Sequence, residues 1–243
     1  MSTTYLVLTK PKTGKKLTNN DENQLVFLSN TLGYLLPSNL LSYYATNGLF
    51  ESSLIEWCKQ FCSPDKIMLD IGAHTGTYAI SLSNSCKEVH CFEPQEMTYY
   101  ALCGGVALSN AKNIHCHKVG LGAPEQRGKM QLNIISNDGG GSSVQVPANN
   151  ESVLRQEYIQ IETLDNYLPD LENIGFIKID VEENEYYALL GAQESLRKSG
   201  FPKILFECNT PTNDSQLFSF LKSLGYSIVP INGYTNMFLA SVE

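Results

Sequence analysis

From Lys66 onward, short apolar runs alternate with helix-like spacing, and this alternation most constrains the fold of the chain. Strands of a covered parallel sheet are typically continuous apolar runs, and helices connect them. Five such runs occur, at 67–71, 88–92, 113–119, 174–179 and 203–207. Helical spacing is found between them, at 76–85, 95–109, 184–198 and 213–223. The pattern predicts an α/β fold built on a parallel sheet.

The C-terminal segment predicts a hairpin at the edge of that sheet. Two further apolar pieces, 226–229 and 236–239, are separated by a short loop containing Asn232-Gly233, which favours an antiparallel turn. We therefore expect a Rossmann-like, mostly parallel seven-stranded sheet with an antiparallel terminal hairpin. Residues 120–162 do not fit the alternation, and 129–135 and 158–161 are expected to form extra strands around a loop.

The first 60 residues precede this pattern. Six apolar residues can line one side of a helix that ends near Ser63-Pro64, namely Leu49, Leu54, Ile55, Trp57, Cys58 and Phe61. We expect residues 1–60 to form a helical preamble or lid packed on the core. Residues 61–243 would then form the ligand-binding domain.

Charge and hydropathy limit the partners of the chain. The formal net charge is −8, which argues against nucleic-acid binding, because that binding depends on Lys and Arg contacts to phosphates. The only basic cluster, formed by Lys10, Lys12, Lys15 and Lys16, is explained by a solvated turn. No apolar run reaches the ~18 residues that would indicate a membrane span. The N-terminus lacks the features of a secretory signal, so a cytoplasmic location is expected.

The cysteine and histidine patterns predict no metal site. The seven cysteines include no Cys-x-x-Cys pair, and in a cytoplasmic protein reduced thiols are expected. Cys58 and Cys62 are four residues apart, but no second ligand pair follows at zinc-site spacing. His115 and His117 share one face of a predicted strand, but no acidic third ligand is evident nearby, so surface or core histidines are expected.

The end of the first strand carries a motif suited to ligand binding. Asp70-Ile-Gly-Ala-His-Thr-Gly76 leads directly into a helix, and Gly72 and Gly76 allow a tight turn and a close approach of a ligand to the backbone. In this fold class, ligands bind beyond the carboxyl ends of the strands. Asp70 would accept a hydrogen bond from a cationic group. The Gly-x-Gly-x-x-Gly fingerprint of dinucleotide binding is absent.

The next two strand ends extend this site. Glu93, in Cys91-Phe92-Glu93-Pro94, follows the glycine loop by about twenty residues, where a carboxylate can bind ribose hydroxyls. A solvated strand end is the alternative reading of Glu93. Gly120 and Leu121, in Val119-Gly-Leu-Gly122, form a glycine-bearing edge at which an adenine could lie.

At these residues the chain resembles the FkbM family of S-adenosylmethionine-dependent methyltransferases. The matching motifs extend over roughly residues 48–208 in the family's order: Gly48-Leu-Phe-Glu51, Asp70–Gly76, Phe92-Glu93-Pro94, Thr163-Leu-Asp165, Ile177–Glu182, Leu190-Gly-Ala192 and Phe206-Glu207. The resemblance implies a class I methyltransferase fold, S-adenosylmethionine as the cofactor, and O-methylation of a hydroxyl on a sugar, a glycan or a small natural product. The expected cofactor-binding residues are Glu51, Asp70, Gly72, Ala73, His74, Gly76, Glu93, Gly120 and Leu121.

Two positions depart from the family pattern. The family usually has Asp-Val-Glu-Gly-x-Glu after the fourth strand, whereas this chain has Asp180-Val-Glu-Glu-Asn-Glu185, so Glu183 replaces a glycine. His74 stands where the family usually has Asn. The backbone at Glu183 is therefore less free, and both changes bear on the acceptor rather than on the fold.

The fourth strand supplies the candidate catalytic residues. Methyl transfer from a sulfonium is an in-line displacement, for which positioning can contribute about 7–11 kcal/mol. A hydroxyl acceptor must also lose its proton, and a placed base typically adds about 10²–10⁴-fold. Lys178, Asp180 and Glu182 share one face of the strand by its period of two. Our hypothesis is that Asp180 or Glu182 orients or deprotonates the hydroxyl, while Lys178 keeps the carboxylates ionised.

Other readings of these residues stay open. Carboxylates are favoured at the start of a helix by its macrodipole, and Glu185 is expected to be structural for this reason. The loop 138–143 is either a hairpin turn or a gate over the site, and Glu207 either lines the acceptor pocket or faces solvent. Asp165 is expected to cap the helix that follows it.

The motifs also leave two other functions open. The Asn/Asp-Pro-Pro-Tyr/Phe motif of amine methylation and the Pro-Cys pair of cytosine C5 methylation are absent from the sequence. The alternatives to a hydroxyl methyltransferase are a methyltransferase acting on a protein or nucleic-acid terminus, and a cofactor-binding scaffold without catalysis. The sequence does not indicate an oligomeric state.

Overall fold

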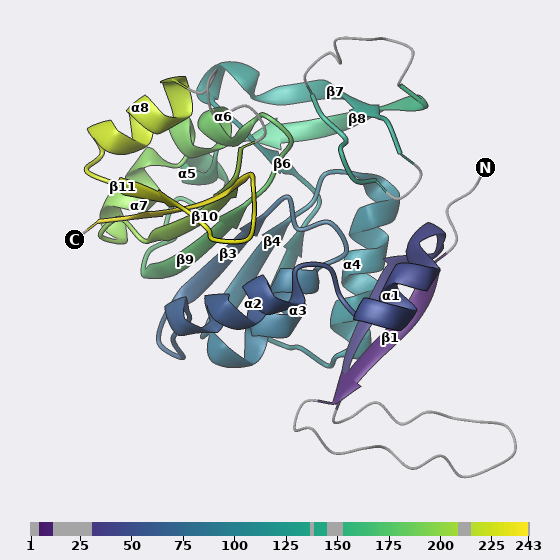
Figure 1. Cartoon of the computed structure of the whole chain (residues 1–243). Helices are drawn as coiled ribbons and strands as arrows, with labels where there is room; N and C mark the ends of the chain where they lie inside the picture. The colour runs from purple at the N-terminus through teal and green to yellow at the C-terminus, as the bar shows by residue number, and fades with distance from the viewer. Residues whose placement is uncertain (1–4, 12–30, 137–138, 145–152, 209–214, 243) are drawn as a thin grey trace, which may run out of the picture.

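A seven-stranded sheet forms the centre of the protein (Figure 1). The computed structural model describes residues 5–11, 31–136, 139–144, 153–208 and 215–242. Strand β12 is antiparallel to both its neighbours, and the other pairs are parallel, which confirms the predicted fold. The strand order is β11 (Ser227–Pro230), β12 (Met237–Ser241), β10 (Lys203–Glu207), β9 (Ile174–Ile179), β3 (Ile67–Ile71), β4 (Glu88–Phe92) and β5 (Ile114–His117).

Helices cover both faces of this sheet because successive residues of its central strands point to opposite sides. Leu69 of β3 belongs to the apolar cluster under α5–α8, whereas Met68 belongs to the cluster under α2–α4. The α-helices are α1 (Leu41–Asn47), α2 (Ser52–Cys58), α3 (Thr77–Leu82), α4 (Glu96–Leu108), α5 (Leu164–Tyr167), α6 (Glu185–Leu190), α7 (Gln193–Lys198) and α8 (Ser215–Ser223). Short 3-10 turns occupy Ser38–Leu40, Lys59–Phe61, Ser83–Ser85 and Pro124–Gln126.

The helix predicted over 184–198 is two helices, with a break at Gly191. A Cβ atom on Gly191 would lie 2.1 Å from the carbonyl oxygen of Gly122, so a glycine is needed where these two segments meet. The carboxylate of Asp165 accepts hydrogen bonds from the backbone N–H groups of Glu194 and Ser195, at 3.0 and 2.9 Å, and from the Ser195 hydroxyl. The expectation that Asp165 caps the short helix directly after it is therefore wrong: Asp165 caps α7, and Thr163 caps α5.

A second, three-stranded sheet lies at the carboxyl edge of the first, at the top of Figure 1. It consists of β6 (Gly120–Leu121), β8 (Arg155–Glu162) and β7 (Gly128–Ile134), with β6 parallel and β7 antiparallel to β8. The predicted extra strands are thus confirmed: β7 is shifted by one residue from 129–135, and β8 is longer than 158–161. The third predicted strand, 113–119, ends at His117, and the chain then enters this second sheet as β6.

The N-terminal segment begins with two paired strands, which precede the helices of the expected preamble. Strands β1 (Tyr5–Pro11) and β2 (Thr31–Pro37) pair antiparallel, and α1 and α2 follow. Strand β2 packs on α4: Gly33 N–H donates to the Ser109 hydroxyl at 2.8 Å, and that hydroxyl donates to Gly33 O at 3.0 Å. This packing stabilises a strand where apolar spacing alone did not indicate one. The domain boundary near residue 60 stays a prediction, and Lys12, Lys15 and Lys16 lie outside the described residues.

Within the described part of the chain, none of the helices has both the length and the apolar character needed to cross a membrane.

The close approach of β3 and β9 predicts a large cost for a side chain at Gly72. This residue has φ +74°, and an added Cβ would lie 1.9 Å from the backbone oxygen of Asp180. Gly200 has nearly the same φ, +72°, but an added Cβ would meet nothing within 4 Å. Gly200→Ala should cost about 1–2 kcal/mol of unfolding free energy from the backbone conformation alone. Gly72→Ala should cost several kcal/mol more, measured by urea denaturation; equal losses would contradict this packing.

Candidate functional site

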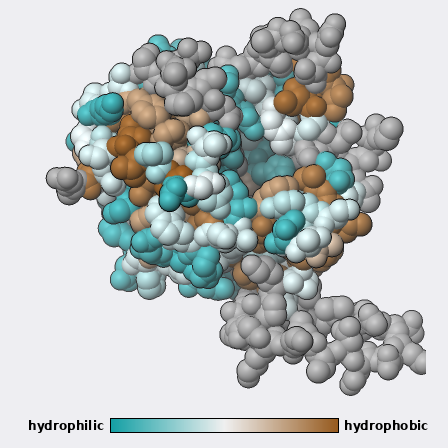
Figure 2. Space-filling view, in the orientation of Figure 1, coloured by the Kyte–Doolittle hydropathy of each residue, from teal (hydrophilic) through white to brown (hydrophobic). Residues whose placement is uncertain are grey.

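A cavity of about 270 Å³ lies at the carboxyl ends of β3, β4 and β9, beneath the three-stranded sheet. Figure 2 shows a hollow with hydrophilic residues near the middle of the face in view. Apolar side chains of the small sheet, including Leu132, Ile159 and Ile161, form one wall. The residues predicted from the sequence that line the cavity are Glu51, Gly72, Ala73, His74, Glu93, Gly120, Leu121, Lys178, Asp180 and Glu182.

Glu93 holds the loop after β3 in place from the end of β4. One of its carboxylate oxygens accepts a hydrogen bond from His74 N–H and the other from Gln95 N–H, each at 2.9 Å. Burial raises the pKa of Glu93 to about 7, and these two N–H groups act in the opposite direction. Since a carboxylate can accept about four hydrogen bonds, Glu93 keeps acceptor capacity towards the cavity.

Asp70 and Gly76, also predicted to bind the cofactor, do not line the cavity. One Asp70 carboxylate oxygen accepts a hydrogen bond from Ala79 N–H of α3 at 3.0 Å, and the other lies 3.9 Å from Lys178 Nζ. Burial raises the pKa of Asp70, although Lys178 opposes that effect. At Gly76, which has φ +82°, a Cβ would lie 2.5 Å from Leu102 Cδ1, so this glycine lets α3 pack against α4.

Lys178 is a buried cation between the two strands that form the cavity floor. Its Nζ donates to Gly72 O at 3.2 Å and to Asp180 Oδ2 at 3.3 Å. Burial works to lower the pKa of Lys178, but the charges of Asp180, Asp70 and Glu51 outweigh it and raise the pKa above its ordinary value. Lys178 therefore stays charged and links the loop after β3 to the end of β9.

Asp180 and Glu207 form an unequal carboxyl pair at the ends of β9 and β10. Burial disfavours a charge on Asp180, but Lys178 and a hydrogen bond from Glu207 hold the pKa of Asp180 below its usual range. Burial and the Asp180 charge raise the pKa of Glu207 to about 8. Asn236 Nδ2 donates to Glu207 Oε1. At neutral pH the proton thus belongs to Glu207, which lies behind Asp180 and outside the cavity lining.

Glu182 connects the end of β9 to the glycine-rich loop that borders the cavity. Its carboxylate accepts from Gly141 N–H at 3.0 Å, and its backbone oxygen accepts from the Ser143 hydroxyl at 2.7 Å. Residues 139–142 and Val144 line the cavity beside it. Asp138, which belongs to the same predicted loop, lies outside the described residues. The side chain of Glu182 is therefore engaged with the loop.

The turn after Asp180 has an unusual backbone. Glu182 and Glu183 have φ values of +53° and +73°, in the left-handed region that favours glycine. The glycine that the family has at position 183 would adopt this backbone conformation without strain. Glu185 accepts from Val181 N–H at 2.9 Å, and burial raises the pKa of Glu185 to about 7. These contacts agree with the structural role expected for Glu185.

Tyr78 and Asn184 are among the cavity residues that the sequence did not indicate. Tyr78, in the first turn of α3, donates its hydroxyl to Glu51 Oε2 at 2.7 Å. Asn184 donates to Leu121 O at 3.3 Å and accepts from Gln126 Nε2 at 2.9 Å, so it connects the two sheets. Neither residue stands out by type or by spacing, because both depend on contacts between distant segments.

Comparison with known proteins places this site in a family context. Residues 70–228 match the family described as "Methyltransferase FkbM domain". No curated protein matches the sequence. Similar solved structures include precorrin-6y C5,15-methyltransferase from Geobacter metallireducens, with a TM-score of 0.51, 12% identity, and 80% of this chain and 90% of that chain covered. Another is a putative rRNA methylase from Clostridium thermocellum, with a TM-score of 0.50, 10% identity, and 77% and 91% covered. These two likenesses show the fold.

The raised pKa of Glu207 predicts that part of the free energy of unfolding depends on pH. Between the ordinary pKa of 4.5 and about 8, the folded chain keeps a proton on Glu207 that the unfolded chain has lost. This contribution is fully present below pH 4.5 and is lost as the pH rises through about 8. Glu207→Gln removes it, so the melting temperature of this variant minus that of the wild type should increase over the same pH range. The exposed Glu183→Gln is the control, and a pH-independent difference for Glu207→Gln would contradict the assignment.

Proposed function

Because this chain belongs to the FkbM family of methyltransferases, we propose that it methylates a hydroxyl group of a sugar, a glycan or a small natural product. The protein is an S-adenosylmethionine-dependent methyltransferase of the class I fold. The observation that carries the proposal is the ionised carboxylate of Asp180, which lines the cavity and is paired with the buried Lys178. A hydroxyl acceptor requires such a group, because its proton must leave when the oxygen is methylated.

The cavity has features suited to the cofactor at three of its edges. Glu93 would accept hydrogen bonds from the ribose hydroxyls with its remaining lone pairs. Gly120 and Leu121, facing the apolar wall of the small sheet, would contact the adenine. The turn from Gly72 to His74, together with Glu51, would border the methionine part, and Asp70 would support this turn from below. Gly76 would contribute through packing.

In methyl transfer to a hydroxyl, Asp180 would orient the acceptor and take its proton. S-adenosylmethionine supplies a methyl group already activated on a sulfonium. Asp180 would accept a hydrogen bond from the acceptor hydroxyl and so aim its oxygen at the methyl carbon. The sulfur of the bound cofactor would keep the electron pair of the C–S bond that breaks as the C–O bond forms, and Asp180 would take the proton that the hydroxyl loses. A carboxylate of low pKa is sufficient, because a methylated, still protonated oxygen is a strong acid.

The charges of the cavity favour a small neutral acceptor over a nucleic acid. Carboxylates of Glu51, Glu93, Asp180 and Glu182 line the cavity, and Lys178, the lysine among the described lining residues, is already paired. A phosphate backbone would meet repulsion here rather than the Lys and Arg contacts that nucleic-acid binding requires. Sugar and polyol hydroxyls can instead donate to these carboxylates. The same charges argue against an acceptor at a nucleic-acid terminus.

The proposal predicts that Asp180→Asn separates catalysis from cofactor binding. Asparagine keeps the size of the side chain but cannot take the proton, so turnover should fall by about 10²–10⁴-fold. Turnover is measured as formation of S-adenosylhomocysteine on a library of glycans and small hydroxyl compounds. Binding of S-adenosylhomocysteine, measured by calorimetry, should persist. Asp170→Asn, the same change at an exposed position outside the cavity lining, is the matched control and should keep full turnover.

Two outcomes would count against this mechanism. Full turnover of Asp180→Asn on the wild-type acceptor would remove Asp180 from the chemistry. If the wild type binds S-adenosylhomocysteine but methylates no hydroxyl in the library, a non-catalytic cofactor-binding scaffold becomes the better description.

Glu93→Gln should weaken cofactor binding. The amide would place an N–H donor opposite either His74 N–H or Gln95 N–H, and it would remove the charge that receives the ribose hydroxyls. Loss of a charge-assisted hydrogen bond typically costs about 1.5–3 kcal/mol, which corresponds to roughly 10–150-fold in the dissociation constant of S-adenosylhomocysteine. Glu96→Gln, at an exposed position three residues further on, should leave calorimetric binding unchanged. Unaltered binding by a folded Glu93→Gln variant would exclude the ribose contact.

A further inference from the structure

Three histidines and a glutamate gather on one face of the edge of the large sheet, outside the cofactor cavity. Glu88 and His90 lie on β4, and His115 and His117 lie on the edge strand β5. The parallel register places His90 beside His115 and Phe92 beside His117, so the side chains of both strands project from the same face. The sequence separates these residues, and the strand pairing brings them together.

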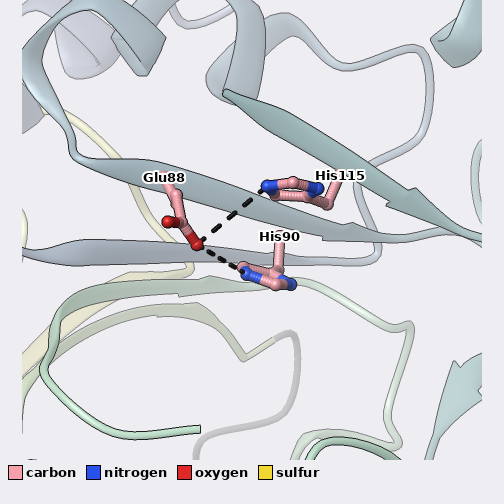
Figure 3. A group of neighbouring side chains, drawn as sticks. All are labelled: Glu88, His90 and His115. Carbon is pink, nitrogen blue, oxygen red and sulfur yellow. Dashed lines mark ion pairs between the residues drawn. The ribbon is translucent and has the colours of Figure 1, made fainter. Parts of the chain in front are cut away.

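Glu88 supplies the acidic group that was not evident beside the histidines in the sequence. Its Oε2 atom lies 3.7 Å from His90 Nε2 and 4.0 Å from His115 Nε2, and Figure 3 shows both rings directed at this one oxygen. One potential ligand atom from each of the three residues lies within 4.8 Å of the others. The arrangement is therefore a compact set of two imidazoles and one carboxylate.

His90 is the central member of this set. Its side chain is 12% exposed, and its Nε2 atom is buried without a hydrogen-bond partner among the described residues. Its other ring nitrogen, Nδ1, lies 3.0 Å from His117 Nε2, and the two rings are stacked. A metal-binding histidine usually has its second ring nitrogen fixed by such a contact, which also sets the tautomer.

The two outer ligands of the set can adjust their positions. Glu88 and His115 are 37% and 47% exposed, so their side chains have room to adjust.

From these observations we propose that Glu88, His90 and His115 bind a divalent transition-metal ion of the Zn²⁺ type, with His117 orienting His90. Zinc is bound at about 2.0–2.2 Å by imidazole nitrogen and carboxylate oxygen, which places tetrahedral ligands about 3.3 Å apart. Small rotations of the exposed Glu88 and His115 side chains would bring the observed Oε2–Nε2 separations of 3.7 and 4.0 Å towards that value. The groove lined by Glu88 and His90 would admit water molecules as the remaining ligands.

The position of the site indicates a structural role rather than a catalytic one. Glu88 begins β4, whereas Glu93 follows its other end, so these two carboxylates are five residues, roughly 16 Å, apart along the strand at ~3.3 Å per residue. A metal shared by β4 and β5 would cross-link the edge strand to the sheet. This inference revises the expectation of no metal, and it does not depend on the identity of the methyl acceptor.

Calorimetric titration with ZnCl₂ tests the proposal on the full chain, after chelator treatment and in a reducing buffer. The wild type should bind one ion, and His115→Ala and Glu88→Gln should each weaken that binding at least tenfold. His117→Ala, which removes only the orienting contact, should weaken it about 10–100-fold. His74→Asn alters the one histidine outside the cluster, which lines the cofactor cavity, and this variant should bind Zn²⁺ as the wild type does.

Two further measurements distinguish this site from the seven cysteines and from misfolding. Co²⁺ in place of Zn²⁺ should give a spectrum without a thiolate charge-transfer band. Zn²⁺ should raise the melting temperature of the wild type but not that of His115→Ala, whose exposed position leaves the fold intact. Wild-type affinity in both His115→Ala and Glu88→Gln, a thiolate band, or no Zn²⁺ binding by the wild type would each overturn the proposal.

Discussion

The rest of the site depends on the contacts that the buried Lys178 makes with two carboxylates. Its ammonium group lies between Asp70 and Asp180 and donates to the backbone of Gly72. Removing one partner from a buried ion pair typically costs about 3–5 kcal/mol, because the other charge is left uncompensated. The same cation keeps Asp180 ionised and fixes the turn after β3. The geometry of the site and its protonation state therefore have a common origin in one side chain.

Around this cation, several carboxylates hold backbone segments that come from distant parts of the sequence. Glu93 binds the N–H groups of His74 and Gln95, Glu182 binds that of Gly141, and Asp165 caps α7. Each contact satisfies N–H donors at a turn or a helix start, where the chain offers no partner of its own. The acidic composition of the chain thus has a structural use near the cavity.

The sequence predicts the central sheet well and its surroundings less well, for physical reasons. Four strands, including 67–71 and 174–179, begin and end where their apolar runs do, because strands covered on both faces leave a continuous signal. The break at Gly191 and the strand β2 depend on packing against Gly122 and α4, which no local pattern records. In the site, most predicted residues line the cavity, but Asp70 and Gly76 do not. The pairing of Glu88 with His115 follows from strand register and was not predictable from spacing.

The two glutamates with positive φ in the turn after β9, Glu182 and Glu183, have a consequence for how this sequence can change. Holding a residue such as Glu183 at φ +73° costs about 1–2 kcal/mol, and a turn of this kind persists because its surroundings fix it. Glutamate and glycine codons differ by a single base. A single base change can therefore replace Glu183 by glycine and relieve the backbone strain. The present sequence has the more strained of these two residues at this position.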